Sequence, residues 1–545
     1  MINLYILMIL ATLASTARVF ILIGLSIVTG WLFGYISIKS KIFENIYISL
    51  NEVLESVPVI TFFPVVLIFF IYHIGGFLGV ELAADFLVFT AIVWNIWMGI
   101  YQAFKTIPLP MLEEVENLRM NFINKLRYLY IPFSVPRIAA NLIPSFSDAF
   151  FYITVSEVFI IGTTSYTTFG IGSVIVYLTS NGLLHYVYYA LLFLGIIIGI
   201  SIYLLREFAR YAVAKYSLDS EIPISRSRIR QRYLARFYTP LTSPARRLGT
   251  LTSRYISTPM KRVVRIRKLE EERNENPIIL RVVGAIIGIS ILGILIYSVY
   301  SIISSVTYKE WTYLISNTLI ILIGLLYDYI RVAIIALVSF VIAISLAYYI
   351  ALHKMAESVL IPLIQIIAAY PAPVYFPLLF TITYGIIAKL LGYFSIEFFV
   401  ILLGFLSTFY YIFYAFWLGV KAIPQEIWEL MDNLDMNYFE KMRFIILPAT
   451  LPYIISGLTS TINSAWGGLM IGEYWPDIIN GHSLSVKHGL MRLLDEWTYQ
   501  GNIALASYAS LIFSVVVVIF AIVFTRHMMN LAREKYVVEE GIYAA

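Results

Sequence analysis

Three observations predict an all-α integral membrane protein. Of the 545 residues, 60% are hydrophobic and only 13% are charged. The mean hydropathy of +0.83 lies far above the range of soluble domains. Apolar stretches of about 20 residues, the length that crosses a bilayer as a helix, recur along the whole chain. We therefore interpret the chain as a multi-pass membrane protein.

The apolar stretches predict about eleven transmembrane helices, five before residue 207 and six after residue 277. Their expected bounds are 14–36, 51–72, 82–104, 137–160, 183–205, 278–302, 323–350, 359–382, 395–418, 450–472 and 503–526. Residues 1–13 are apolar too, but they lack the basic segment and the cleavage pattern of a signal peptide. We expect them to remain in the mature protein.

A basic segment separates the two sets of helices. From Arg206 to Arg273 there are 17 Lys or Arg residues against 6 acidic ones, and four prolines interrupt any long helix. We interpret 207–277 as a cytoplasmic linker that contacts anionic lipid headgroups. The loops on the same side of the predicted topology are also basic. The positive-inside rule then places the linker and the C-terminus in the cytoplasm and the N-terminus outside the cell membrane.

Several kinds of chemistry are not expected. The chain has no cysteine, which excludes disulfides, thiolate metal sites and cysteine nucleophiles. Its six histidines have no metal-ligand spacing, and its net charge of +5 is too modest to suggest a nucleic-acid partner. The sequence also lacks the Gly-x4-Gly-Lys-[Ser/Thr] loop that holds nucleotide phosphates. We expect no enzymatic activity and no cofactor bound by this chain.

Residues 105–136 and 421–452 repeat one another at a shift of 316 without a gap. The identical residues include Lys105, Pro108, Glu113, Asn117, Leu118, Met120, Asn121, Lys125, Arg127, Pro132 and Pro136, which match Lys421, Pro424, Glu429, Asn433, Leu434, Met436, Asn437, Lys441, Arg443, Pro448 and Pro452. Further matches are Arg18 with Arg331 and Glu157 with Glu473. The copies run in the same direction, so we predict two parallel five-helix cores with the span at 278–302 as an extra crossing.

The repeated segment has apolar residues at helical spacing. They are Leu112, Val115, Leu118 and Phe122 in one copy and Trp428, Met431, Leu434 and Phe439 in the other. Such a stripe predicts a short surface helix that packs into a groove of a cytoplasmic partner. The alternative is a solvated connection between two spans.

The segment resembles the EAA loop of binding-protein-dependent ABC importer permeases, whose family form is E-A-A-x3-G-x9-I-x-L-P. Counting back from Pro132 and Pro448 places the motif glutamate at Glu113 and Glu429. The family's alanines are replaced by Glu114 and Val115 in one copy and by Leu430 and Met431 in the other. Its glycine is replaced by Arg119 and Asp435, which reach the glycine conformation less easily.

The flanking residues resemble the nitrate, sulfonate, taurine and bicarbonate class of these permeases. The resemblance rests on an arginine early in each first core helix, a glutamate after each loop-following helix, and the turn Gly170-x-Gly172. The second copy has 481–489 instead of that turn. The resemblance covers about 190 residues in each half and implies a MetI-like type I importer fold. The implied division is 1–206 as a first permease core, 207–277 as linker, 278–310 as extra span and 311–545 as a second core.

By this resemblance the chain is the membrane subunit of a prokaryotic importer that moves a small solute, such as the anions nitrate, sulfonate, taurine or bicarbonate. ATP and Mg would bind to two separate cytoplasmic ABC ATPase subunits, and an outer solute-binding protein would deliver the cargo. The residues expected to couple to the ATPases are Glu113, Asn117, Leu118, Asn121, Arg127, Glu429, Asn433, Leu434, Asn437 and Arg443.

Polar residues within the predicted spans suggest a pathway, because intramembrane charge is costly. The candidate pathway or vestibule residues are Arg18, Asp148, Glu157, Arg331, Asn463, Trp466 and Glu473. One interpretation is that the two arginines attract anions. The alternative is that they reach the outer headgroups or pair with the two glutamates, that the other polar groups bond across helices, and that Trp466 is packing.

Two other classes are weighed against the permease. An ion-coupled secondary transporter would place broken helices and carboxylates at the membrane midplane, whereas the repeat identity here is concentrated in a cytoplasmic loop. An integral-membrane enzyme would need a cluster of histidines or carboxylates at one face. The loop pattern therefore favours the permease.

Overall fold

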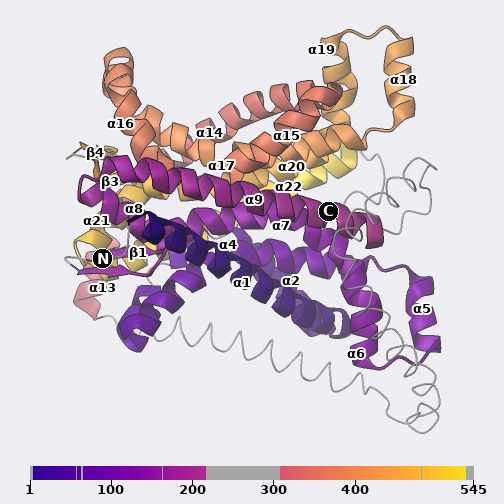
Figure 1. The fold of residues 1–545 in the computed structure, drawn as a ribbon, viewed down its shortest axis with the longest axis horizontal. Coiled ribbons are helices and arrows are strands. Elements are labelled where there is room, and N and C mark those ends of the chain that lie inside the picture. The colour runs from indigo at the N-terminus through magenta and orange to yellow at the C-terminus, as the bar shows by residue number, and fades with distance from the viewer. Residues whose placement is uncertain are drawn as a thin grey trace.

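The computed structural model describes residues 4–56, 58–62, 66–161, 164–216, 307–479 and 482–535. Within them the chain is almost entirely helical, with two small antiparallel hairpins (Figure 1). Eight helical stretches in this part of the chain are long and apolar enough to cross a membrane. They are Leu4–Lys39, Gly76–Lys105, Phe122–Ser156, Leu184–Ala212, Tyr308–Leu352, Ala372–Ala422, Tyr438–Gly472 and Ile503–Phe520.

The two halves share most of their order of elements, although the second begins with an additional short helix. The first half consists of α1 (Leu4–Lys39), α2 (Lys41–Ser56), η1 (Val59–Phe62), η2 (Leu67–Ile74), α4 (Gly76–Lys105), α5 (Leu109–Asn117), α6 (Phe122–Lys125), η3 (Leu126–Tyr130), α7 (Ile131–Ser156), β1 (Val158–Ile161), β2 (Thr164–Thr167), α8 (Ile171–Ser180) and α9 (Leu184–Tyr216). The second half consists of α13 (Tyr308–Ser316), α14 (Thr318–Leu352), α15 (Lys354–Ala369), α16 (Ala372–Leu391), η4 (Gly392–Phe394), α17 (Ser395–Ala422), α18 (Gln425–Asn433), α19 (Tyr438–Glu440), η5 (Lys441–Ile446), α20 (Leu447–Gly472), β3 (Tyr474–Ile479), β4 (His482–Ser485), α21 (Leu490–Tyr499) and α22 (Ile503–Lys535).

Two of the predicted spans are not single helices. The span expected at 359–382 breaks after Ala369, where Tyr370 has an extended backbone (ψ 116°) before Pro371. In the span expected at 51–72, α2 ends at Ser56, and the short 3-10 helix η1 and the π-helix η2 follow it. Both breaks lie at a proline, because proline lacks the N–H of a helical bond and disfavours the helical conformation in the residue before it. The span expected at 278–302 and the linker lie outside the described residues.

The helices that follow the repeated loops start in the same way. Both α7 and α20 are preceded by a π-helical turn, η3 or η5, and have proline in their first turn. Proline carries no N–H to bond four residues back, so widened turns before Pro132 and Pro448 are compatible with its presence. Each turn joins the loop helix region to a long helix of the membrane core.

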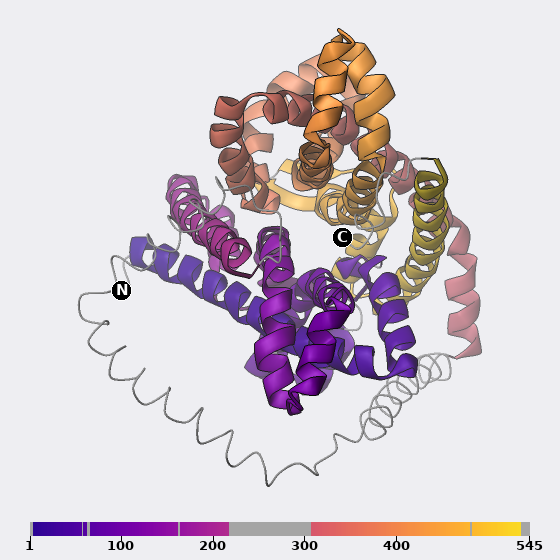
Figure 2. The same cartoon turned by 90° about the vertical axis from the view of Figure 1, so that its right-hand side faces the viewer.

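The two halves pack against one another reciprocally (Figure 2). Helix α9 of the first half packs against α15 of the second, and α22 of the second packs against α2 and η1 of the first. The Tyr370 hydroxyl adds a hydrogen bond of 2.6 Å to the carbonyl of Leu191. Helices α9 and α22 each end their half of the described chain, and each packs against the other half.

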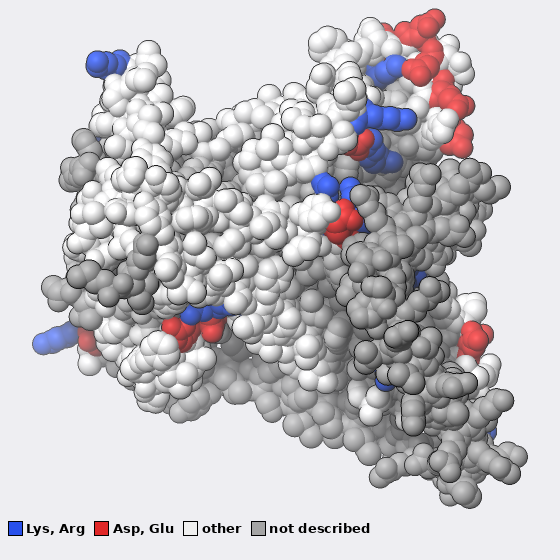
Figure 3. Space-filling model, in the orientation of Figure 1, with Lys and Arg blue, Asp and Glu red and all other residues white. Residues whose placement is uncertain are grey.

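Outward-facing apolar residues form the surface of the helix bundle. On α9, Leu192, Ile196 and Ile200 are exposed, whereas Leu194 and Ile198 on the opposite face are buried in the first half's core. This helical alternation, together with the span lengths, is what a lipid-facing helix requires. The face shown in Figure 3 is largely uncharged between its two ends.

The short helices and the hairpins lie at opposite ends of the bundle. Figure 1 places both α18 (upper right) and α5 (lower right) at the right-hand end and both hairpins at the left-hand end. The chain enters the bundle near the hairpins, and α22 runs toward the end that carries α5 and α18. The two copies of the repeated loop therefore lie at the same end of the bundle.

Candidate solute cavity and loop helices

The loop helices, α5 and α18, end in the same hydrogen-bonded turn. In α5 the amide of Arg119 donates to the carbonyl of Glu116, and the amide of Met120 donates to that of Val115. In α18 the amides of Asp435 and Met436 make the corresponding bonds to Asp432 and Met431. This pattern is the Schellman motif, in which a left-handed residue closes a helix C-terminus.

The left-handed residues are Arg119, with φ 46°, and Asp435, with φ 47°. They are the two non-glycine residues with positive φ in the described part of the chain. Both occupy the position at which the EAA pattern has glycine. The turn geometry that these substitutions placed in doubt is therefore present in both copies, at some cost in backbone strain.

One of the two repeated asparagine pairs, Asn121 with Asn437, caps helices. The side-chain oxygen of Asn121 accepts the amide of Asn124 at 3.0 Å, and that of Asn437 accepts the amide of Glu440 at 3.0 Å. Their repetition thus has a local explanation, because an N-cap side chain satisfies an otherwise unbonded amide. Asn121 and Asn437 therefore help to form the loop itself, and their contact with a partner stays a prediction.

Some side chains of the apolar stripe on the loop helices are buried against the protein, and others are exposed. Leu112, Val115 and Trp428 pack against the cores of their own halves, and Met431 is fully buried. The helices of each half thus cover Met431 fully and the other three side chains in part. The stripe residues that remain exposed are Leu118 (52%), Leu434 (63%) and Phe439 (80%).

The polar residues expected to couple to a partner lie on the exposed side of the loops. The side chains of Glu113, Asn117, Glu429 and Asn433 are exposed. Arg127 and Arg443 are exposed as well, and each guanidinium lies over the neighbouring ring, of Tyr128 at 5.6 Å and of Phe444 at 5.7 Å. The surface around both glutamates is thus open to a macromolecule.

A lysine before each loop helix forms an ion pair with a glutamate on another helix of its half, α2 or α15. The Lys105 ammonium contacts the Glu44 carboxylate at 2.5 Å, and the Tyr101 hydroxyl donates to the same carboxylate at 2.5 Å. Burial raises the pKa of Glu44, but the bonds from Lys105 and Tyr101 outweigh it and hold that pKa below its usual value. In the second half Lys421 pairs with Glu357 at 2.8 Å.

At the opposite end, ion pairs surround the partly buried Arg18. Its guanidinium pairs with Glu81, with Asp85 at 3.2 Å and with Glu157 at 3.6 Å. Glu157 also accepts the Ser15 hydroxyl at 2.5 Å and the amide of Gly172 at 2.6 Å, at the start of α8. Every charge in this group has a partner, as burial demands.

An equivalent group surrounds Arg331. This side chain donates to both oxygens of Glu397 at 2.7 Å, to Glu473 at 2.9 Å and to Asp328 at 3.1 Å. Asp328 accepts the amides of Leu490 and Met491 at the start of α21. Its carboxylate thus holds the place that Ser15 holds before α8.

Glycine is required where each glutamate meets the following helix. Gly170 and Gly489 are the N-cap residues of α8 and α21. A Cβ at Gly170 would overlap the Glu157 carboxylate, and one at Gly489 would overlap that of Glu473. Gly489 therefore serves the function of Gly170, although the second copy has no Gly-x-Gly sequence.

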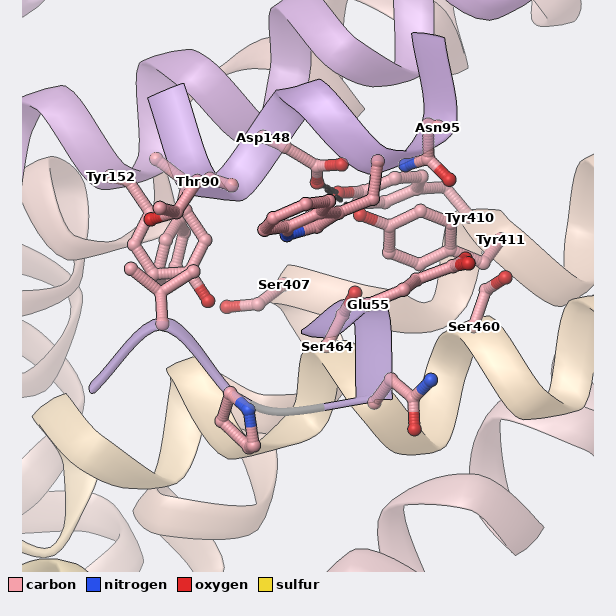
Figure 4. Close-up of a pocket in the computed structure, with 16 residues that line it drawn as sticks. Glu55, Thr90, Asn95, Asp148, Tyr152, Ser407, Tyr410, Tyr411, Ser460 and Ser464 are labelled. Carbon is pink, nitrogen blue, oxygen red and sulfur yellow. Dashed lines mark hydrogen bonds between the residues drawn. The ribbon is translucent and has the colours of Figure 1, made fainter. Parts of the chain in front are cut away.

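A polar cavity lies between the two halves, with space of about 80 Å³ for the centres of water molecules (Figure 4). One water needs roughly 10–15 Å³ on this measure, so the cavity holds several waters or a small solute. It lies between α4 and α7 of the first half and α17 and α20 of the second. The lining residues are Glu55, Pro58, Val59, Thr90, Ala91, Trp94, Asn95, Asp148, Phe151, Tyr152, Ser407, Tyr410, Tyr411, Ser460, Asn463 and Ser464.

Of the expected pathway residues, Asp148 and Asn463 line this cavity. Arg18, Arg331, Glu157 and Glu473 do not, because they are bound in the two ion-pair groups. Their geometry follows the alternative interpretation, in which the arginines pair with the glutamates. Trp466 is also outside the lining; it is 1% exposed and packs edge-on against Tyr329 and Phe513.

Sequence reasoning missed most of the lining, although the repeat carried a signal for it. Four pairs of lining residues are related by the same shift of 316 as the loops. They are Ala91 with Ser407, Trp94 with Tyr410, Asn95 with Tyr411, and Asp148 with Ser464. It also missed Glu81, Asp85, Asp328 and Glu397, the partners of the two arginines. No group of three or more potential metal ligands occurs among the described residues.

Comparison with known proteins finds a similarity for part of the chain. Comparison with curated proteins gives no match. Residues 339–533 match the model of a protein family. This range includes the second loop helix, the second half of the cavity lining and Glu473. The family is described as "Binding-protein-dependent transport system inner membrane component", and residues 339–533 are similar to it.

Proposed function

We propose that the chain is the membrane permease component of an ABC importer. The family match over residues 339–533 carries the proposal. That range contains α18 with its exposed Glu429, and α5 presents Glu113 in the same way at the same end of the bundle. A chain with helices of membrane-spanning length and a pair of exposed loop helices fits this role.

We further propose that one chain supplies both halves of the permease. The cores would be 1–206 and 311–545, joined by the linker at 207–277 and the span at 278–310. The repeated element order and the reciprocal packing of α9 and α22 support this arrangement. The pseudo-twofold axis would then pass through the cavity, to which equivalent helices of both halves contribute.

Two cytoplasmic ATPase subunits would supply the energy. Each subunit would receive one loop helix in a groove, with Leu118 or Leu434 as apolar contact and Glu113 or Glu429 as charged contact. ATP and Mg would bind to those subunits alone. When the ATPase dimer closes, a difference in how it holds the loops in its two states would shift the membrane halves.

The ion pairs at the loops would pass this movement into the membrane. Lys105 fixes the start of the first loop to Glu44 on α2, and α2 extends to Glu55 at the cavity. Displacement of α5 would therefore move α2 and, with it, Glu55 in the cavity wall. Lys421 and Glu357 provide the corresponding connection in the second half.

An outer solute-binding protein would deliver the cargo at the end that carries the hairpins. The N-terminus would lie outside the cell membrane, and the linker and C-terminus would lie in the cytoplasm. The expectation of an anionic solute rests on the family resemblance. Arg18 and Arg331, which we expected to attract an anion, are instead neutralised by carboxylates. An ion-coupled secondary transporter is not favoured, since the family match concerns binding-protein-dependent transport.

A pull-down with the ATPase subunit tests the proposal. Glu113→Ala with Glu429→Ala, and separately Leu118→Asp with Leu434→Asp, should each reduce ATPase attachment by tenfold or more. The expected loss is large because truncating one partner of a buried interfacial charge pair costs about 2–5 kcal/mol. The chain should remain inserted in the membrane, because all four side chains are exposed.

Glu207→Ala is the matched control, since it removes a carboxylate from α9 outside the loop helices. It should leave attachment unchanged. If both double variants bind the ATPase and transport as well as the original chain, the loops are simple connections and the proposal fails. Hydrolysis of ATP by the purified chain alone would contradict it as well.

A further inference from the structure

The central cavity has an acidic and aromatic lining. Its charged residues are Glu55 and Asp148, and no Lys or Arg occurs among the described residues that line it. The remaining polar groups are hydroxyls and side-chain amides from both halves. A site with this composition offers an anion no compensating charge, although burial of an anion would demand one.

Asp148 is the most constrained of these groups. It lies on α7, and its Oδ1 accepts hydrogen bonds from Tyr410, at 3.5 Å, and from Tyr411. Figure 4 shows both tyrosine hydroxyls directed toward it across the interface between the halves. The described residues provide no donor to its other oxygen, Oδ2. The tyrosines thus fix the carboxylate in place, and one oxygen remains for a ligand.

Aromatic rings surround the same space. Trp94 and Tyr152 come from the first half, and Tyr410 and Tyr411 from the second. Aromatic faces attract cations through their quadrupole, and Trp is the strongest of them. A carboxylate together with aromatic faces is the combination that recognises a substituted ammonium group.

The charge is supplied by one half alone. At the shift of 316, Ser464 stands where the first half has Asp148, and both line the cavity. The hydroxyl cannot carry a charge, so the cavity has one acidic wall and one neutral wall rich in serine. A solute with a cationic end and a hydroxyl or other polar end would match both.

From these contacts we infer that the cavity binds an organic cation, a substituted ammonium compound that carries a polar group, rather than an anion. This inference rests on the proposed function, because it names the solute class of that importer. It commits Asp148 Oδ2 to the cationic end and the serines of α17 and α20 to the polar end. The solute should be small, as the cavity volume demands.

An isosteric series of probes tests the solute class on the full chain in lipid nanodiscs. Choline is the cation, 3,3-dimethylbutan-1-ol is the neutral compound of the same shape, and 3,3-dimethylbutanoate is the anion. A ligand of the folded state raises the melting temperature as its concentration exceeds its dissociation constant. Choline should raise the melting temperature at concentrations at least tenfold lower than those that the neutral compound requires. The anion should not raise the melting temperature.

Asp148→Asn should reduce the apparent affinity for choline by roughly tenfold or more, because bonds to charged groups are the stronger ones. It should leave the affinity for the neutral compound unchanged. Glu207→Gln is the control, since it removes a carboxylate outside the cavity and should change neither affinity. Asn95→Lys gives an independent result even if Asp148→Asn does not fold, since it places a cation in the lining and should remove choline binding.

The inference fails if the anion stabilises the chain as much as choline, if no probe stabilises it, or if Asp148→Asn retains the choline effect. ATPase attachment is measured separately on the same preparations. A chain that binds its ATPase but prefers the anion overturns the solute class and leaves the permease function intact. A chain that prefers choline but attaches no ATPase supports the solute class and contradicts the proposed permease function.

Discussion

Arg119 and Asp435 hold the same left-handed backbone conformation, with φ 46° and 47°, at equivalent ends of α5 and α18. Each is followed by a methionine whose amide bonds back to the last turn of the loop helix. The turn is thus retained although the residue that favours it has been replaced in both copies. Its hydrogen bonds, rather than the residue type, maintain the conformation.

We predict that glycine at either position stabilises the turn and that valine destabilises it. Arg119→Gly should relieve about 1 kcal/mol of strain, and Arg119→Val should add about 1–2 kcal/mol, because a left-handed Cβ crowds the following carbonyl. Asp435→Gly should gain less, since Asp tolerates this conformation better than most residues. Hydrogen exchange of the Met120 and Met436 amides measures the effect directly.

Slower exchange in the glycine variants and faster exchange in the valine variant are the expected outcomes. Exchange at Leu129, in the buried part of the π-helical turn, serves as the internal reference. Equal exchange at Met120 in all three chains would mean that the left-handed conformation carries no strain.

The contacts of Gly170 and Gly489 give a second prediction. Gly170→Ala and Gly489→Ala should each destabilise the chain by about 1–3 kcal/mol, because the added methyl overlaps a buried glutamate carboxylate. Both glycines have extended backbone, with φ −176° at Gly170 and 174° at Gly489, so overlap and not backbone strain is the cause. The melting temperature in detergent is the measurement.

Gly24→Ala is the matched control. A Cβ at Gly24 meets nothing within 4 Å, and the residue lies within α1. Alanine there should be neutral or should raise stability by up to about 1 kcal/mol, from its higher helix propensity. A similar loss in all three variants would show that the glutamate contacts are not responsible.

The bond between Lys105 and Glu44 predicts a dependence on pH. The pKa of Glu44 is lower in the folded chain than its usual value, so its carboxylate stabilises the fold above the usual carboxyl pKa. That stability is lost as the pH falls through the lowered value. Lys105→Met should raise the pKa of Glu44, because burial remains while the bond is gone. The acid-side fall in melting temperature should then begin at higher pH.

Lys41→Met should have little effect, since that lysine is 82% exposed and lies 3.7 Å from the carboxylate. Melting temperatures of the three chains between pH 3 and pH 7 allow the comparison. The assignment is wrong if the Lys105 and Lys41 variants follow the same curve as the original chain.

The sequence predicted the long helices better than the broken ones. Hydropathy detects an apolar stretch but not a break in its helical backbone. It therefore predicts 51–72 and 359–382 as one span each. Pro371 marks the break in the second of these, and Pro58, 313 positions earlier, marks the break in the first. Giving more weight to proline than to hydropathy would have corrected both bounds.

The candidate site was predicted in part, for a similar reason. Charge is costly in an apolar span, so the sequence alone indicates Arg18 and Asp148 as candidate functional residues. Tyr410 and Asn95 carry no charge, and their position at the cavity follows only from the packing of four helices. The partners of Arg18 could not be found from spacing, because Glu81 lies 63 positions away on another helix.

Single cysteines test the proposed orientation, and the natural absence of cysteine makes each label specific. Ser180 is exposed at the end of α8, near the hairpins, and Glu116 is exposed on α5 at the other end of the bundle. The positive-inside rule assigns the basic loops to the cytoplasm. Ser180→Cys should therefore react with an impermeant maleimide in intact cells, and Glu116→Cys should react only after the membrane is opened. Labelling of Glu116→Cys from outside would place both loop helices beyond the reach of any ATPase, and the proposed coupling would then be impossible.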